Sequence, residues 1–137
     1  MQVGSILVGN EEKINKALRI RKILGGGMRQ SGYLASAAIF AIENHIDDLK
    51  KDHIKAKEIG SVLENLNFIK KVEPVSTNII IFSLIKEIDQ NYFIDKMKEN
   101  NIFMISLGND KLRIVTHRDY TDDQHNYFLS TIRKIKF

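Results

Sequence analysis

Three consecutive glycines, Gly25 to Gly27, interrupt two helical patterns and limit what the first third of the chain can form. Glycine in a helix interior costs roughly 0.5–1 kcal/mol relative to alanine, so a run of three ends the preceding helix. That helix is predicted over residues 11–24, because Asn10 is a good N-cap and glutamates follow it. The glycines therefore separate this helix from a second one that begins near residue 30.

The glycine run lies among cations, with Lys22 before it and Arg29 after it. Where a helix begins, unpaired backbone N–H groups meet the positive end of the helix dipole. Glycines let a ligand approach the backbone closely, and cationic side chains add charge-assisted hydrogen bonds to an anion. The residues alone support two interpretations: a phosphate-binding loop, or a flexible turn with solvated cations around it. The pattern matches neither the P-loop nor the dinucleotide fingerprint.

The sequence pattern of the first part of the chain is typical of a segment of a larger domain. The apolar run VGSILVG predicts a buried strand over residues 3–9, with no strand before it to serve as a neighbour. Apolar residues then recur at helical spacing over residues 30–66, which predicts one long helix or two helices with a bend near Asp47 and Asp48. We assign residues 1–73 to this part.

The second part, residues 74–137, begins at the sole proline and alternates strands with helices. The residues from Leu107 to Asp110 predict a hairpin turn, and the sequence TDDQ from Thr121 predicts a capping box. The order of elements indicates a small α/β domain, a three-stranded antiparallel sheet with two helices on one face. Strands are predicted over residues 77–84, 101–106 and 111–116, and helices after Asp89 and Thr121.

Composition narrows the function classes. The 137 residues are 43% hydrophobic and 28% charged, which predicts a packed core. There is no cysteine, which excludes thiolate chemistry and fits a reduced cytoplasmic setting. No apolar run approaches the ~20 residues that cross a membrane, and the start of the chain does not match a secretory signal. The net charge of +4 comes from lysines spread along helical faces without a nucleic-acid motif, so we expect no nucleic-acid partner.

The four histidines do not suggest a metal site. His45 and His53 lie on the long helical stretch without a nearby ligand partner. His117 is interpreted as a structural residue or one that supports a site residue, and His125, in the first turn of the last helix, is expected to be solvated. We therefore predict no metal ligand.

Four segments, VGSILVG, RKILGGGMRQSG, LKKDHIKAK and LRIVTHRD, resemble in order and spacing the second half of low-specificity threonine aldolases. These enzymes belong to the β-eliminating lyase group and have the aspartate-aminotransferase-like fold (fold type I) that binds pyridoxal phosphate (PLP). The resemblance covers nearly the whole chain. It implies an α/β fold in which residues 1–73 are a remnant of the large PLP-binding domain and residues 74–137 form the small C-terminal domain.

The resemblance also implies the roles of three residues. Lys22 and Arg29 match the region near the cofactor phosphate, often at a subunit interface, and Arg113 matches the arginine that binds the substrate carboxylate. A guanidinium fork can pair two parallel hydrogen bonds with a carboxylate, which lysine cannot. Without the resemblance, Arg113 would read as a sheet-surface arginine. Side chains alternate between the two faces of a strand, so Arg113 is predicted to lie on the same face as Val115.

In the family, PLP is held through a Schiff base to a lysine a few residues before the VGS strand. Here Met1 and Gln2 stand at that place, and the first lysine is Lys13 in the next helix. The resemblance therefore assigns no catalytic residue to this chain. The complete enzymes are aldehyde-lyases that cleave L-threonine or L-allo-threonine to glycine and acetaldehyde, and we expect these 137 residues alone to be inactive.

Two hypotheses follow. The chain is the C-terminal part of a threonine-aldolase-like lyase that needs an N-terminal half, or it is a non-catalytic remnant domain that oligomerises or binds a partner. Both predict exposed apolar surface beyond that of an ordinary monomer, and hence a homo-oligomer or a complementing N-terminal half. A small amino-acid substrate belongs to the first hypothesis only.

Overall fold

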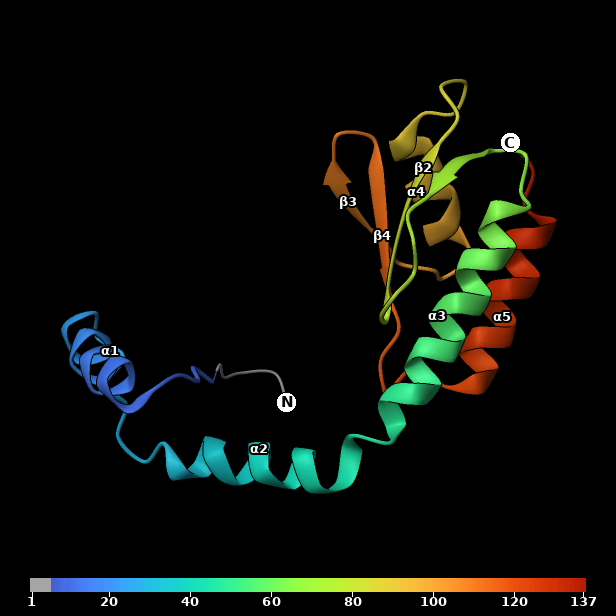
Figure 1. Cartoon of the computed structure of the whole chain (residues 1–137). Coiled ribbons are helices and arrows are strands. Elements are labelled where there is room, and N and C mark those ends of the chain that lie inside the picture. The colour runs from blue at the N-terminus through green and yellow to red at the C-terminus, as the bar shows by residue number, and fades with distance from the viewer. Residues whose placement is uncertain (1–5) are drawn as a thin grey trace. The chain divides into compact units, whose positions relative to one another are not determined.

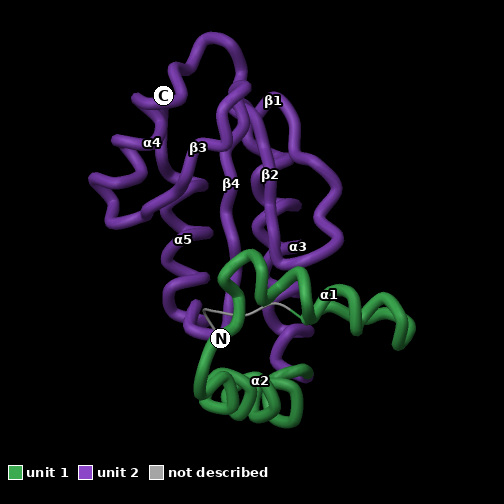
Figure 2. The backbone as a smooth tube through the Cα atoms, turned by 90° about the vertical axis from the view of Figure 1, so that its left-hand side faces the viewer, with its two compact units in different colours: residues 1–46 green, residues 47–137 purple. Residues whose placement is uncertain are grey.

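The computed structural model describes residues 6–137, which divide into two compact units, Met1–Ile46 and Asp47–Phe137. We call these unit 1 and unit 2 (Figure 2). The division follows Ile46, whereas the boundary inferred from the sequence lies between residues 73 and 74. That boundary concerns the domains of a complete fold and stays a prediction.

Unit 1 holds two helices, α1 (Glu11–Ile23) and α2 (Gly32–His45). The predicted N-cap is confirmed, because the Asn10 side chain accepts a hydrogen bond from the backbone N–H of Lys13 at 3.0 Å. The predicted stop is also confirmed. Gly25 has φ +82°, a conformation that favours glycine, and the Gly26 N–H donates to the Arg21 carbonyl at 2.8 Å.

The strand predicted over residues 3–9 is not formed in the part of that segment that the structure describes, residues 6–9. Residues 3–5 lie outside the described part of the chain, and residues 6–9 are exposed and not in a strand. A strand needs a hydrogen-bonded neighbour, and none of the strands in the described residues pairs with this segment. Residues 6–9 therefore stay irregular despite their apolar sequence.

The helical stretch predicted over residues 30–66 is two helices, α2 and α3 (Asp48–Glu64), so the alternative with a bend is correct. Ile46 and Asp47 separate them, and the Lys50 N–H turns back to the Asp47 carbonyl at 3.3 Å. The break matters for the fold because α3 packs on the sheet of unit 2, whereas α2 buries none of its residues.

Unit 2 is built on a four-stranded sheet in the order β1-β2-β4-β3, antiparallel throughout (Figure 1). The prediction of three strands is wrong by one, because it missed β1. That strand is short, and its sequence IKKV carries two exposed lysines in place of apolar alternation. Only pairing with its neighbour β2 makes it a strand. The strands are β1 (Ile69–Val72), β2 (Ile79–Leu84), β3 (Ile105–Gly108) and β4 (Lys111–Val115).

The strand predicted over residues 101–106 begins only at Ile105. Asn101 has φ +55°, and the Ile102 N–H donates to the Met97 carbonyl at 3.0 Å, so these residues finish the preceding helix turn. The hairpin after β3 is confirmed. Asn109 and Asp110 both have positive φ, the conformation that a tight turn between twisted strands needs.

Three helices cover one face of this sheet: the two predicted for residues 74–137, and α3 from the helical stretch predicted over residues 30–66. They are α3, α4 (Gln90–Glu99) and α5 (Asp122–Lys134). The predicted caps of α4 and α5 are both formed, the second as a complete capping box at Thr121. Alternate residues of the central strands meet the helices in one apolar core. Its fully buried side chains include Ile59, Leu63, Ile80, Phe82, Phe93, Met97, Leu112 and Ile132.

Candidate functional site

The predicted phosphate loop joins α1 to α2 in unit 1. Lys22 lies in the last turn of α1 and Arg29 in the turn before α2, and both side chains are exposed. Neither forms an ion pair with any residue in the described range 6–137. The Ser31 side chain does not cap α2, which leaves N–H groups of the first turn to other acceptors. The loop thus offers two cations and a helix start to an anion.

Two glycines of this loop, Gly25 and Gly26, are needed where they stand. A Cβ on Gly26 would lie 2.7 Å from Cγ and 3.1 Å from the carbonyl oxygen of Arg21, closer than side chains normally approach. Gly25 needs the left-handed conformation. The backbone therefore folds tightly back on the end of α1. At Gly25 and Gly26 no side chain projects from the loop between Lys22 and Arg29.

Arg113 lies on β4 in unit 2. Its cross-strand partners are Ile81 on β2 and Ile105 on β3. The neighbouring Leu112 is fully buried in the core, and Arg113, Ile114 and Val115 line a pocket of about 730 Å³ at this end of the strand. Arg113 is half-buried, and its Nε is buried without a hydrogen-bond partner.

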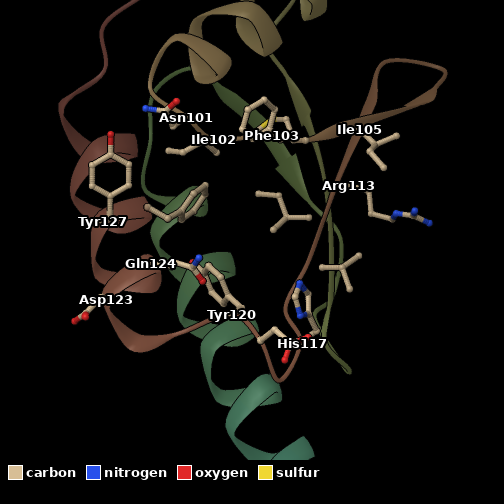
Figure 3. A pocket seen from close by; sticks show the side chains of 15 residues that line it. Asn101, Ile102, Phe103, Ile105, Arg113, His117, Tyr120, Asp123, Gln124 and Tyr127 are labelled. Carbon is tan, nitrogen blue, oxygen red and sulfur yellow. The ribbon is translucent and has the colours of Figure 1, made fainter. Parts of the chain in front are cut away.

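The pocket opens beside the end of β4. In Figure 3, Ile105 and Arg113 stand on neighbouring strands at one side, while Tyr120, Gln124 and Tyr127 line the other. Beyond Arg113 the edge of β4 has no neighbouring strand, because β3 starts at Ile105. The polar and charged residues of the lining are Asn101, Arg113, His117, Asp119, Tyr120, Asp123, Gln124 and Tyr127.

The chain entering α5 is held by Lys55 of α3. Its Nζ donates to the Tyr120 carbonyl at 2.7 Å and pairs with an Asp122 carboxylate oxygen at 2.8 Å. The hydrogen bond from Lys55 lowers the pKa of Asp122. Burial, and secondarily the charge of Glu58, raises the pKa of Tyr120 to about 12. Tyr120 therefore presents a neutral hydroxyl at neutral pH and does not serve as a base there.

The sequence predicted a solvated His125, and this prediction is wrong. The side chain is buried, with 6% of its surface exposed. Its Nε2 lies 3.0 Å from Glu58 Oε2 on α3, and its Nδ1 is buried without a partner. The signal was present in the sequence, because His125 precedes Phe128, Leu129 and Ile132 at helical spacing. This histidine joins α3 to α5 and does not line the pocket.

Sequence reasoning proposed Arg113 as a site residue but did not predict the residues around it. Ile81 and Ile105 come from distant parts of the chain and become its neighbours only through strand register. His117, which was interpreted as a supporting residue, is exposed at the pocket rim. Within residues 6–137, no group of three His, Asp or Glu side chains could hold a metal ion. In that same range, no helix is both long and apolar enough to span a bilayer.

Comparison with known proteins adds a family match. The family model described as "Beta-eliminating lyase" matches residues 1–87. Low-specificity L-threonine aldolase 1 of Arabidopsis thaliana is 36% identical over 137 residues, which cover 96% of this chain and 38% of that protein. Low specificity L-threonine aldolase of Escherichia coli K12 is 37% identical over 122 residues, 89% of this chain and 35% of that protein. The chain thus spans little more than a third of the length of these relatives.

Solved structures with the same fold come from more distant proteins. The cystine C-S lyase C-DES, in complex with its product cysteine persulfide, aligns with a TM-score of 0.59 at 13% identity, covering 78% of this chain and 29% of that one. A C-DES variant with glycine covalently linked to its PLP cofactor gives a TM-score of 0.58, also at 13% identity, covering 77% and 29%. These similarities show the fold.

Proposed function

Because the chain belongs to the beta-eliminating lyase family, we propose that it is the C-terminal part of a PLP-dependent lyase of the threonine-aldolase type. The reaction of the whole enzyme is the retro-aldol cleavage of L-threonine or L-allo-threonine to glycine and acetaldehyde. The observation that carries the proposal is Arg113, a half-buried arginine whose Nε lacks an acceptor beside an open pocket. An arginine in this condition suits an external carboxylate.

In this proposal Arg113 binds the carboxylate of the amino-acid substrate. No carboxylate of residues 6–137 pairs with its guanidinium, so the charge is available to a ligand. Two parallel N–H donors fix the plane of a bound carboxylate as well as its position. The rigid β4 strand, hydrogen-bonded to neighbours on both sides at this residue, holds the donor group in place.

Lys22 and Arg29 would hold the phosphate of PLP. Two exposed cations without an ion-pair partner among residues 6–137, a tight glycine turn and an uncapped helix start together fit a phosphate group. PLP, when bound, supplies an electron sink for the bond cleavage. The residues of this chain position and neutralise the anionic groups around that chemistry.

These 137 residues are proposed to be inactive by themselves. Lys13, the first lysine, belongs to the first turn of α1, where its N–H is taken by the Asn10 cap. It follows the segment VGSILVG, whereas the family's Schiff-base lysine comes before the matching segment. Loss of an essential nucleophile removes orders of magnitude of rate. With added PLP, the purified chain should release no glycine from L-threonine above a control of free PLP.

Binding experiments test the two anion sites without requiring activity. Titration of PLP, and separately of inorganic phosphate, into the chain should give heat that the Lys22→Ala and Arg29→Ala variants lose. Lys16→Ala is a matched control, because Lys16 lies on the same helix but pairs with Glu12 at 2.7 Å. Equal binding by all variants would contradict the assignment of the loop.

A non-catalytic role in oligomerisation or partner binding is the second candidate. The observation that favours it is the surface of unit 1, where α2 buries none of its residues although its sequence is largely apolar. An N-terminal half of a lyase or a second copy of the chain would cover such a surface. A stable oligomer that binds neither PLP nor phosphate would support this role over the first.

A further inference from the structure

The edge of β4 beyond Arg113 carries unused backbone groups. The Thr116 N–H donates to the Asn78 carbonyl at 3.0 Å, so the backbone groups of Thr116 point toward the side of β2. Backbone groups of successive strand residues point to opposite sides, and the N–H and C=O of Val115 therefore point away from β2. Among residues 6–137 they have no hydrogen-bond partner. Val115 thus offers a free donor and a free acceptor at the edge of the sheet.

The described part of unit 2 does not fill this place. Continued in register, β3 would set Phe103 opposite Val115, but β3 begins only at Ile105. The Ile102 N–H is held by the Met97 carbonyl at 3.0 Å, and Phe103 is exposed outside any strand. The pocket of about 730 Å³ lies at this open edge, and both Val115 and Phe103 line it.

A segment of unit 1 also lacks a strand partner. Residues 6–9 have the apolar sequence ILVG, and their backbone forms no hydrogen bond with any of residues 6–137. Ile6, Leu7 and Val8 are each at least 69% exposed. Consecutive exposed apolar side chains on an unpaired backbone are typical of a strand without its neighbour.

We propose that the open edge of β4 binds residues 6–9 of a second copy of the chain as an added strand. Free backbone groups at a strand edge select an extended peptide, and the adjoining pocket selects apolar side chains. Within the described residues each copy carries such an edge and such a segment, so a reciprocal exchange uses both and closes as a two-fold dimer. This inference does not depend on the lyase proposal, and it names the surfaces through which copies of the chain associate.

A register with Leu7 opposite Val115 places the most apolar surface in the pocket. Alternate side chains of a strand face opposite sides of the sheet, so Ile6 and Val8 then lie on the face of Ile114. Ile114 lines the pocket and packs against the core of unit 2. Burial of two large aliphatic side chains supplies the hydrophobic gain, and the paired backbone groups of Val115 fix the register.

The first experiment follows hydrogen exchange of the Val115 amide by NMR in the isotope-labelled chain. A free edge amide exchanges rapidly, whereas filling about nine-tenths of the edges should slow the exchange roughly tenfold. Because the occupant is a second copy, the slowing should appear as the protein concentration rises. Rapid exchange at every concentration would overturn the inference.

Val115→Pro tests the edge. It removes the outward N–H and costs no bond to β2, because that N–H points away from β2, and proline is tolerated at such positions of a strand. The Leu7 amide of this variant should lose its concentration-dependent protection. Val115→Ile keeps the N–H and is the matched control, so it should match the native chain.

Val8→Asp tests the segment from the other side and does not alter the sheet. Its carboxylate would lie against Ile114, where it loses hydration without gaining a donor, so the slowing of Val115 exchange should disappear. Ile20→Asp is the matched control, because Ile20 is 55% exposed on α1 in the same unit and lies outside the segment. It should keep the protection of the native chain.

A mixing experiment tests whether edge and segment come from different copies. The Val8→Asp chain keeps an intact edge and the Val115→Pro chain keeps an intact segment, so each is defective alone. Unlabelled Val115→Pro chain added to labelled Val8→Asp chain should restore the slow exchange of the Val115 amide.

Two results would overturn the exchange between copies: no restoration on mixing, or protection of the native Val115 amide that dilution does not change. The lyase proposal is tested separately, through binding of PLP and phosphate to the glycine loop. Either proposal can therefore fail while the other stands.

Discussion

Thr116→Val removes one buried hydroxyl that joins α3 to the sheet. Thr116 follows β4 directly and is fully buried, and its Oγ1 donates to the Asp52 carbonyl of α3 at 2.8 Å. The backbone at this point is secured separately. The Thr116 N–H donates to the Asn78 carbonyl at 3.0 Å, and Asn78 Nδ2 donates to the Thr116 carbonyl at 2.7 Å. The substitution thus deletes the side-chain bond and keeps the strand pairing.

The expected loss is about 1 kcal/mol in the free energy of unfolding of unit 2, the net value of one neutral intramolecular hydrogen bond. Valine has nearly the volume of threonine, so no cavity adds to the cost. The Asp52 carbonyl lies inside α3 and keeps its helical donor, so it is not left unsatisfied. For a domain of this size, about 1 kcal/mol lowers the Tm by roughly 4–8 °C.

Urea denaturation followed by near-UV circular dichroism measures the change. The chain has no tryptophan, and three of its four tyrosines lie in unit 2, which makes the signal report mainly on that unit. Thr116→Ser keeps the hydroxyl and should retain most of the bond. Thr77→Val, at an exposed position, should change the stability by less than about 0.5 kcal/mol. A loss in Thr116→Ser equal to that in Thr116→Val would refute the assignment of the effect to the hydroxyl.

Three further predictions concern the loop, the acid response and the surface. Gly25 has φ +82°, so Gly25→Ala should lower the local free energy of opening by about 1 kcal/mol. Hydrogen exchange of the Gly26 amide should then become roughly fivefold faster. Gly32→Ala, at an open position with ordinary φ, should leave that exchange rate unchanged. The hydrogen bonds from Lys71 and Lys111 lower the pKa of Glu73, so their stabilisation is present above the unfolded carboxyl pKa and is lost as pH falls through the lowered value. Glu73→Gln should flatten that acid limb in low salt, and an unchanged limb would contradict the pairing. Light scattering at high protein concentration should give a molecular mass above the 15.8 kDa of one chain. Phe40→Asp, at an exposed position of α2, should lower that mass. A native chain that is entirely monomeric would count against self-association.

Features that depend on neighbours in the chain could be read from the sequence. The caps at Asn10, Asp89 and Thr121 each need only a side chain and an N–H three residues later. The glycine stop and the hairpin turn likewise follow from local backbone preferences. These predictions held because the energies that decide them act over a few residues.

Features that depend on distant partners could not. The lysine-rich sequence of β1 gives no apolar alternation, and only its pairing with β2 makes it a strand. Residues 6–9 have a strand-like sequence and remain irregular, because no strand in the described residues pairs with them. His125 faces Glu58 rather than solvent because α5 packs on α3.

For the candidate site, the sequence by itself determined which residues are candidates for binding anions. Lys22 and Arg29 lie around the glycines, and the resemblance to threonine aldolases singled out Arg113 in the segment LRIVTHRD. The tertiary structure decided what surrounds Arg113. Strand register brings Ile81 and Ile105 to either side of it, and the uncovered edge of β4 opens the pocket beside it. Register couples segments far apart in the chain, so no local pattern specifies it.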